Sequence, residues 1–439
     1  MSSVIGRTRW RPVRWSKFIL ALGVAIAAAA AAAAPAYAQS AAAAPAQAST
    51  PAPAASAAPP FTAGWQNGFI IQSANGDNRL QFGVVVQADG KFTTDDPPAF
   101  TDTFTIRKAR PGIQGRVAKY FDFRLTPELG NGSATVVDAY IDTRFSSAFR
   151  IRTGKDKTPV GLELLYGDPG LLFPERSLLS SLVPNRDVGV QAQGDLAGGK
   201  LSYAGGVFNG INDGSSSTTD VDTNNGKDLA GRVLYQPFRG SKTHPALANL
   251  GFHIGGSTGK QSGTSLPSFK TSAGQTYFSY NGASAAGDRT RVSPAFFYYY
   301  SVVGVFAEYA RTSQDISKSG VTRTVTNDGW DVTGTIILTG ETASSGVIQP
   351  KKPFDPAAGH FGAAQAVARY AELHVDQDAF DAGFAASNAS QKAKQTSIGV
   401  NWYPVSFVKY YLAYEHTSFS GGADRPAENS IILRTQLAF

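Results

Sequence analysis

Basic side chains are concentrated between residues 103 and 157, where 11 Lys and Arg residues stand against 5 Asp and Glu residues. The stretch RKARPGIQGRVAKYFDFRL, residues 107–125, holds six of these basic residues. A guanidinium group presents a planar fork of N–H donors that matches the oxygens of phosphate or carboxylate. A hydrated row of such groups would therefore attract small anions, and phosphate is a good match for it.

The order of these residues predicts β-strands. In 107–125 a polar set is even-numbered, whereas Ile113, Phe121 and Leu125 belong to an odd-numbered apolar set. Because side chains alternate between the two faces of a strand, this segment has one cationic and one apolar face. Residues 136–152, VVDAYIDTRFSSAFRIR, repeat the pattern. The cationic face of the two segments comprises Lys108, Arg110, Arg116, Arg124, Arg144, Arg150 and Arg152.

Residues 1–38 have the features of a secretory signal peptide. A basic segment precedes the alanine-rich apolar segment 18–34, and Ala36-Tyr37-Ala38 forms a small-x-small cleavage site. A retained membrane anchor is the alternative. Removal after Ala38 would change the balance from 40 basic and 33 acidic residues to 35 and 33. This near-neutral balance gives no indication of nucleic-acid binding.

Residues 39–60 are uncharged and rich in Ala and Pro, which predicts a disordered tether. The chain has no Cys, which excludes disulfides and thiolate metal sites, and its five His residues lack metal-ligand spacing. We therefore expect no metal and no cofactor. Beyond the signal peptide, no apolar run approaches the roughly 18–20 residues of a membrane helix. A location in a membrane would therefore require a barrel.

Residues 61–439 predict an all-β fold, a transmembrane antiparallel β-barrel. Alternating segments recur throughout, joined by tight connectors such as 197–200 and by long polar ones at 209–228, 256–290, 312–329 and 340–395. Short turns at one end and long loops at the other are typical of outer-membrane barrels, and roughly 24 residues per strand and connector predicts about 16 strands. An aromatic content of 11% and a C-terminal strand ending in Phe439 favour this fold over a soluble β-sandwich, which shows similar alternation.

A barrel fold determines whether the cationic face is directed toward lipid or toward the lumen. An arginine that faces lipid near the midplane costs about 2–4 kcal/mol, so these cations must face a hydrated lumen. Residues 166–184, YGDPGLLFPERSLLSSLVP, are too apolar for an exposed loop and too short for a membrane helix. We expect them to fold inward as a constriction loop, with the leucines against the wall and Arg176 toward the pore. An outward-lying lid or an irregular strand is the alternative.

From Ile106 to about Gly210 the chain resembles the phosphate-selective porin O/P family. The resemblance rests on the order and spacing of IRKARPGIQGRVAKYFDFRL, VVDAYIDTRF, RIRTGKDKTPVGLE, FPERSLLSSLVPNRDVGV and SYAGGVFNG. It implies a 16-stranded barrel in the bacterial outer membrane that assembles as a homotrimer. An inward-folded loop would narrow each pore, and arginines and lysines would favour phosphate or polyphosphate over other anions.

The resemblance also carries over individual residues. Asp156 and Val160 replace aromatic residues that are common in the family, which leaves the local loop packing open. The pore cations that the resemblance implies are Arg107, Lys108, Arg110, Lys157, Arg176 and Arg186.

The sequence leaves other functions open. A general or weakly anion-selective porin would result if Asp122, Glu128, Asp138 and Asp142, which share the cationic face, pair with the arginines. Residues 255–259, GGSTG, match G-x-S-x-G, but that motif needs a strand-to-helix turn, whereas here it would open a Gly/Ser loop. We therefore expect that this protein is not an enzyme. A structural or adhesive barrel with a plugged pore is a further alternative.

Overall fold

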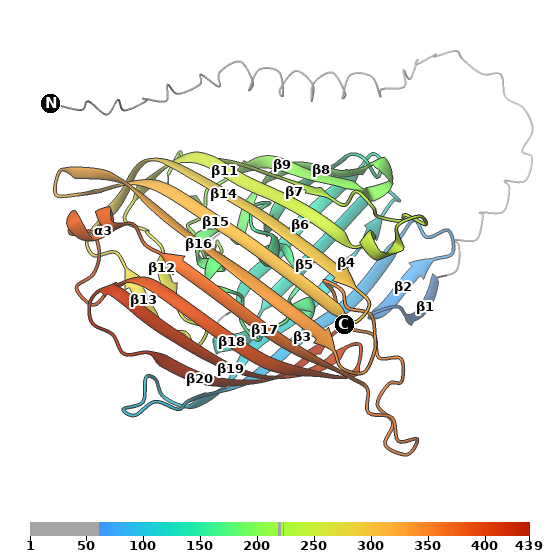
Figure 1. Ribbon diagram of the computed structural model, residues 1–439. Coiled ribbons are helices and arrows are strands. Elements are labelled where there is room, and N and C mark those ends of the chain that lie inside the picture. The colour runs from blue at the N-terminus through green and yellow to red at the C-terminus, as the bar shows by residue number, and fades with distance from the viewer. Residues whose placement is uncertain (1–60, 133, 218–220, 223) are drawn as a thin grey trace, which may run out of the picture. The chain divides into compact units, whose positions relative to one another are not determined.

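The computed structural model describes residues 61–439, apart from residues 133, 218–220 and 223 (Figure 1). The predicted signal peptide, residues 1–38, and the predicted tether, residues 39–60, lie outside the described residues. Within the part of the chain that the structure describes, no helix is long and apolar enough to cross a membrane.

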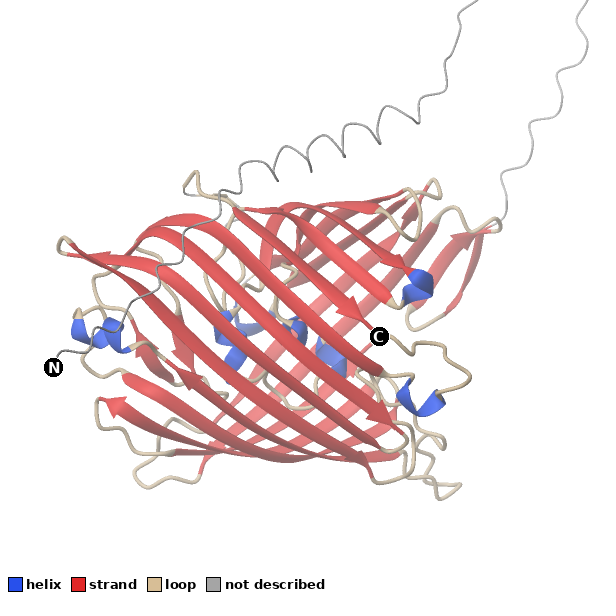
Figure 2. Cartoon of the chain, turned by 45° about the horizontal axis from the view of Figure 1, so that its top comes forward, coloured by secondary structure: helices blue, strands red, loops and turns tan. Residues whose placement is uncertain are grey.

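Sixteen antiparallel strands close into a barrel, which confirms the predicted fold (Figures 1 and 2). Each strand pairs with the next barrel strand along the chain, and the last pairs back with the first, where Leu437 lies opposite Val86. Closure leaves no open sheet edge in the wall. The barrel strands are β3 (Arg79–Thr93), β4 (Thr103–Val117), β5 (Phe121–Glu128), β6 (Thr135–Arg144), β7 (Arg150–Lys157), β8 (Arg186–Leu196), β9 (Leu201–Phe208), β10 (Asp228–Tyr235), β11 (Leu250–Gly263), β14 (Ser284–Tyr300), β15 (Val303–Lys318), β16 (Val321–Ile337), β17 (Ala363–His374), β18 (Ser390–Val405), β19 (Val408–Gly422) and β20 (Glu428–Ala438).

Shorter elements lie at the barrel ends and inside it. A hairpin of β1 (Phe61–Trp65) and β2 (Phe69–Ser73) pairs with the beginning of β3. A second hairpin, β12 (Ser268–Lys270) and β13 (Thr276–Ser279), belongs to the connector between β11 and β14. The helices are short: η1 (Gly130–Gly132), α2 (Leu162–Leu165), η2 (Asp168–Gly170), η3 (Leu178–Leu182), η4 (Ala197–Gly199), η5 (Pro245–Leu247) and α3 (Gln377–Asp381).

The wall alternates as predicted, with apolar side chains outside and polar side chains inside. On β19, Tyr410 and Leu412 are 40% and 51% exposed, whereas Lys409 and Glu415 are 2% and 1% exposed. A barrel in a membrane presents its apolar set to lipid and its polar set to the lumen. Apolar residues that are exposed on the described chain therefore mark the outer surface.

A β-bulge in β4 explains how the neighbours Arg107 and Lys108 both reach the lumen. Opposite β3, Gln87 pairs with Lys108 and Ala88 pairs with Ile106, so Arg107 is the extra residue. An extra residue interrupts the strict alternation of a strand. Arg107 consequently contacts the inward loop, while Ile106 is 51% exposed on the outer surface.

The prediction of a long loop is wrong for three of the four segments, because these segments contain strands. Within 256–290, β11 continues to Gly263 and β14 begins at Ser284. Most of 312–329 belongs to β15 and β16, and 340–395 contains β17 and the first part of β18. These strand ends carry polar residues on both faces, as Thr324 and Asn327 of β16 illustrate. The apolar alternation that identifies a membrane strand is therefore absent there.

The predicted division into short turns at one end and long loops at the other is incomplete. Because the strands alternate in direction, every second connector lies at the end that holds the C-terminus. Tight turns occur there at 118–120, 145–149, 197–200, 301–302 and 406–407. Two long connectors, 236–249 and 338–362, lie at this same end (Figure 1).

Apolar side chains fill one side of the lumen. Leu178, Leu179 and Leu182 of η3 are buried together with Phe269 of β12 and Phe278 of β13. The helix η3 packs against the inner face of β15, β16 and β17, and short helices are visible inside the barrel in Figure 2. On another side of the lumen, an open space is lined by residues of β4 to β10.

Candidate functional site

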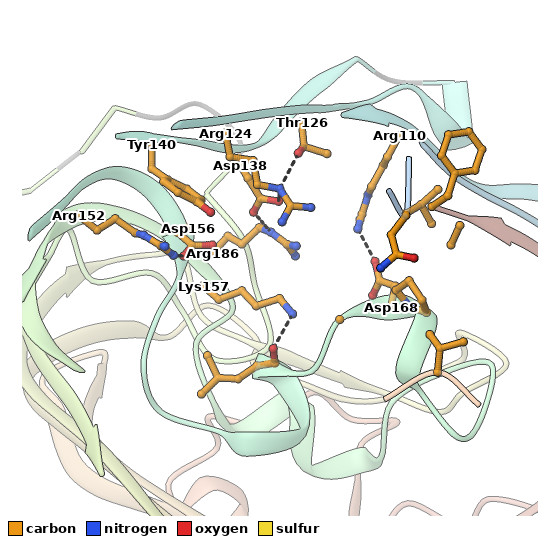
Figure 3. A pocket seen from close by; sticks show the side chains of 18 of the residues that line it. Arg110, Arg124, Thr126, Asp138, Tyr140, Arg152, Asp156, Lys157, Asp168 and Arg186 are labelled. Carbon is orange, nitrogen blue, oxygen red and sulfur yellow. Dashed lines mark hydrogen bonds and ion pairs between the residues drawn. The ribbon is translucent and has the colours of Figure 1, made fainter. Parts of the chain in front are cut away.

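A cavity of about 690 Å³, termed the proximal cavity, lies at the end of the barrel that holds the C-terminus (Figure 3). Trp65, Phe407 and Phe439 form part of its apolar lining. Its positive side chains outnumber its carboxylates six to three, which gives an excess of three positive charges. The charged lining consists of Arg110, Arg124, Arg152, Lys157, Arg186 and Arg232 against Asp138, Asp156 and Asp168.

A second cavity of about 470 Å³, the distal cavity, is lined by the constriction loop and by the connectors 209–227 and 264–283. It too has an excess of positive charge, with four cations against two carboxylates. The charged lining consists of Lys91, Arg107, Arg176 and Lys270 against Glu175 and Asp213. An ion that traverses the barrel through these two cavities meets a net positive lining in both.

Asp168 of the constriction loop lies where β4 approaches the loop from the side of the proximal cavity. Its carboxylate lies 2.8 Å from Lys108 Nζ, 2.5 Å from Arg110 Nη1 and 3.2 Å from Arg176 Nη2. Figure 3 shows Arg110 pointing at this carboxylate across the cavity. Burial alone would raise the pKa of Asp168, but the charges of Lys108, Arg176 and Arg110 outweigh burial and hold it well below its usual range. Asp168 is therefore ionised at neutral pH.

Glu175 makes the corresponding contact on the side of the distal cavity. Its carboxylate lies 2.7 Å from Arg107 Nε and 2.9 Å from Arg434 Nη2 of β20. Burial would raise the pKa of Glu175, but Arg107 and Arg434 lower it far below its usual range. The loop thus carries two clusters of ion pairs, one centred on Asp168 and the other on Glu175.

The connector between β7 and β8, residues 158–185, contains the constriction loop, and its backbone is hydrogen-bonded to the opposite wall. Glu308 of β15 accepts hydrogen bonds from the backbone N–H groups of Leu162 and Glu163 at 2.7 and 2.9 Å. Lys409 of β19 donates to the Leu171 carbonyl at 2.6 Å. The loop backbone is therefore held in place independently of Asp168 and Glu175.

The structure divides the eleven predicted cations into three groups. Arg107, Lys108, Arg110 and Arg176 meet at the loop, and Arg124, Arg152, Lys157 and Arg186 line the proximal cavity. Lys157 donates to the carbonyls of Leu165 and Tyr166 at 3.2 and 2.7 Å. The remaining three lie near the tight turns, outside both cavities: Arg116, Arg144 and Arg150.

Ten of the eleven predicted cations form an ion pair with a carboxylate. Arg186 lies 2.7 Å from Asp138, and Arg152 lies 2.6 Å from Asp142 and also contacts Asp156. Arg124 is looser, at 3.6 Å from Asp138. The others that are paired are Arg107, Lys108, Arg110, Arg116, Arg144, Arg150 and Arg176. Pairing weakens the field in the pore without abolishing the excess of positive charge.

Sequence reasoning missed several cations of the lumen. Arg232 of β10 lines the proximal cavity. Among the described residues, no carboxylate oxygen lies within 4.0 Å of its guanidinium nitrogens. Its position opposite Val233 and Tyr235 in an alternating segment was a usable signal. Arg434 of β20, which pairs with Glu175, was not selected as a site residue. Lys91 and Lys270 of the distal cavity were not selected either.

The G-x-S-x-G match does not form a turn. Residues 255–259 lie in the middle of β11, where Gly255 pairs with Ser293 and Gly259 with Arg289. The expectation that the motif follows a strand and opens a loop was therefore wrong. The Ser257 hydroxyl accepts a hydrogen bond from Arg291 Nη1 at 3.2 Å, and this environment differs from the strand-to-helix turn of a nucleophile elbow.

Comparison with known proteins gives one family and several similar folds. The family model described as "Phosphate-selective porin O and P" matches residues 80–439. A search of curated protein sequences gives no match.

Solved structures with a similar fold include three outer-membrane proteins. The channel DcaP of Acinetobacter baumannii aligns with a TM-score of 0.54 at 13% identity, covering 85% of this chain and 99% of that one. An anion-selective porin from Comamonas acidovorans gives 0.54 and 13%, with coverage of 82% and 100%. OmpF of Salmonella typhi, in complex with daunomycin, gives 0.53 and 12%, with coverage of 83% and 99%. At such low identity the similarity establishes the fold alone.

Proposed function

This chain belongs to the phosphate-selective porin O and P family, and we propose that it is an outer-membrane porin for passive diffusion of small anions. Phosphate or polyphosphate is the proposed preferred substrate. The observation that carries the proposal is the excess of positive charge in both cavities, six cations against three carboxylates and four against two. A narrow pore with low-dielectric walls focuses the field of its lining charges and raises the local concentration of anions.

The preference for phosphate is supported by the type and distribution of the cations. Most are arginines, whose planar forks bind two oxygens of one anion at a time. They are spread from Arg152 and Arg124 in the proximal cavity, through Arg110, to Arg107 beside the distal cavity. Conduction requires several weak sites, because an ion must leave as readily as it enters. The solved anion-selective porin of similar fold is consistent with this function.

A general or weakly anion-selective porin is the second candidate. It is favoured by the pairing of ten of the eleven predicted cations with carboxylates, which leaves only a modest net charge. Asp138 illustrates the effect, since it lies 2.7 Å from Arg186 and 3.6 Å from Arg124. In that case chloride and phosphate would pass without a specific phosphate site.

We further propose that the porin is exported by a cleaved signal peptide and assembles as a homotrimer. The wall has unequal height, which supports assembly: β7, β9 and β10 have 8 residues each, whereas β14 and β16 have 17. Eight residues tilted by about 45° reach roughly 19 Å, less than the apolar band of about 25 Å. The short wall is therefore better covered by neighbouring copies than by lipid. Cross-linking and the mobility of unheated protein on a gel would test this.

The proposed function is tested in a planar bilayer. The reversal potential across a KCl gradient measures the preference for anions, and phosphate is then titrated into chloride. Anion preference with a chloride current that phosphate blocks supports a phosphate-selective pore. Anion preference without block leaves the general porin. Preference for cations would refute the proposal, because the carboxylates of the lining would then dominate.

A further inference from the structure

Two carboxylates of the constriction loop occupy positions that the pore cations would otherwise offer to an anion. Asp168 makes three contacts that a bound oxyanion would make: Lys108 and Arg176 approach its Oδ1 at 2.8 and 3.2 Å, and Arg110 approaches its Oδ2 at 2.5 Å. The side chains of all three cations are at most 14% exposed. A permeating anion can therefore bind these donors only after the carboxylate of Asp168 has moved away from them.

Glu175 repeats the arrangement closer to the distal cavity. Arg107 donates to both of its oxygens, at 2.7 Å from Nε and 3.0 Å from Nη2, in the two-point geometry typical of bound carboxylate or phosphate. Arg434 adds a third contact at 2.9 Å. Both acidic residues belong to the loop rather than to the barrel wall, and Asp168 lines the proximal cavity whereas Glu175 lines the distal cavity.

We propose that Asp168 and Glu175 are tethered competitors of the permeating anion. An anion crosses the loop by exchanging with these carboxylates, and the exchange favours oxyanions over chloride. This inference rests on the proposed function, because it assumes that anions pass between the two cavities. It assigns selectivity to acidic residues of the loop, in addition to the cations of the wall.

The preference for oxyanions follows from the geometry of the donors. A departing carboxylate leaves two or three buried donors without partners, which is costly unless the incoming ion replaces the lost hydrogen bonds. Lys108 and Arg110 donate to different oxygens of Asp168, so the site is shaped for an anion with two separate acceptor atoms rather than one. Phosphate offers several oxygens to such a set, whereas chloride is a single centre and satisfies fewer of the donors.

The exchange requires a change of side-chain torsion and no movement of the loop backbone. Next to the segment that carries Asp168, Lys409 donates a hydrogen bond to the Leu171 carbonyl at 2.6 Å, and Asn401 donates one to the Leu172 carbonyl at 2.9 Å. Because the surrounding cations outweigh burial and keep the pKa of Asp168 low, the side chain remains an anion at neutral pH. A competitor with this charge is present whenever the pore conducts.

The test compares Asp168→Asn with the wild-type protein in planar bilayers containing KCl. The measured quantity is the concentration of inorganic phosphate that halves the chloride current at neutral pH. Asparagine keeps the shape and removes the charge, so phosphate no longer competes with a tethered carboxylate. We expect the half-blocking concentration to fall on the order of tenfold, the change that corresponds to one charge-assisted hydrogen bond.

The matched control is Asp122→Asn. Asp122 is also paired with arginines, at 2.7 Å from Arg116 and 3.9 Å from Arg144, but it lies outside both cavities. This variant should leave the half-blocking concentration within about twofold of wild type, as expected for a partly exposed pair. Glu175→Gln provides a second, independent variant should Asp168→Asn fail to form a heat-resistant barrel.

The outcomes separate this inference from the proposed function. Tighter block in either loop variant, with the control unchanged, supports tethered competition. Unchanged or weaker block in the folded variants, with anion preference retained, overturns it, because the carboxylates would then only position the cations. A wild-type channel without anion preference overturns the proposed function itself.

Discussion

Replacing Arg232 with glutamine should weaken anion preference more than replacing an arginine that is paired outside the cavities. Arg232 lines the proximal cavity, and among the described residues it has no carboxylate within ion-pair distance. The substitution Arg232→Gln therefore lowers the excess of positive charge in that cavity by a full unit, from three to two. No carboxylate within ion-pair distance loses its partner, so the change acts chiefly on the electrostatic field of the cavity.

The size of the effect follows from the dimensions of the cavity. In a volume of about 690 Å³, an ion at the centre lies about 7 Å from the guanidinium group, which corresponds to about 0.6 kcal/mol at the dielectric constant of water. This energy changes the local anion concentration about threefold. The low-dielectric walls increase the interaction and salt reduces it.

The assay is the reversal potential across a KCl gradient at about 0.1 M, where the Debye length is about 10 Å. Arg116→Gln is the control, since Arg116 is paired with Asp122 at 2.7 Å and lies outside both cavities. We expect the ratio of anion to cation permeability to fall by up to about sevenfold for Arg232→Gln, because the threefold loss of anions is accompanied by a similar gain of cations, and to change little for the control. At about 1 M salt the two should become similar, because the Debye length is then only about 3 Å. Equal effects of the two variants at low salt would refute the assignment of Arg232 to the pore.

Three further predictions concern the constriction loop. Leu182→Ala removes a fully buried side chain from the contact between η3 and the wall, so we expect a loss of about 2–5 kcal/mol in stability and a larger single-channel conductance; unchanged thermal unfolding would contradict this packing. Glu308→Gln weakens the hydrogen bonds to the N–H groups of Leu162 and Glu163 and should increase current noise, whereas a quiet channel would show that the loop is held elsewhere. In the folded protein the pKa values of Asp168 and Glu175 are lowered. The stability that these two groups contribute is therefore present above their unfolded pKa of about 4, and it is lost as the pH falls through their lower folded pKa values. Thermal unfolding should therefore vary little from pH 8 to 5 on account of these groups, and a transition near pH 6 that disappears in Asp168→Asn would be evidence against the assignment.

The sequence by itself determined the class of fold and the inner face of most strands. Alternation has a period of two, and a lipid-facing wall tolerates few polar residues, so β19 and β20 could be read residue by residue. The reading failed for parts of β15, β16 and β17, since strand ends beyond the apolar band carry polar residues on both faces. Arg107 was predicted as a pore cation from the family resemblance, since alternation alone does not place it in the lumen and a bulge leaves no mark in an alternating pattern.

Only the tertiary structure decided which cations share a cavity and which acids oppose them. Arg116 and Arg110 lie on the same face of β4, yet one is at a turn and the other meets Asp168, which is 58 residues away in the chain. Arg434 reaches Glu175 across 259 residues, a pairing that depends on closure of the barrel and on the inward course of the loop. Periodicity fixes the direction of a side chain relative to its own strand, whereas electrostatic partners depend on distances between strands and loops, and these exist only once the chain is folded.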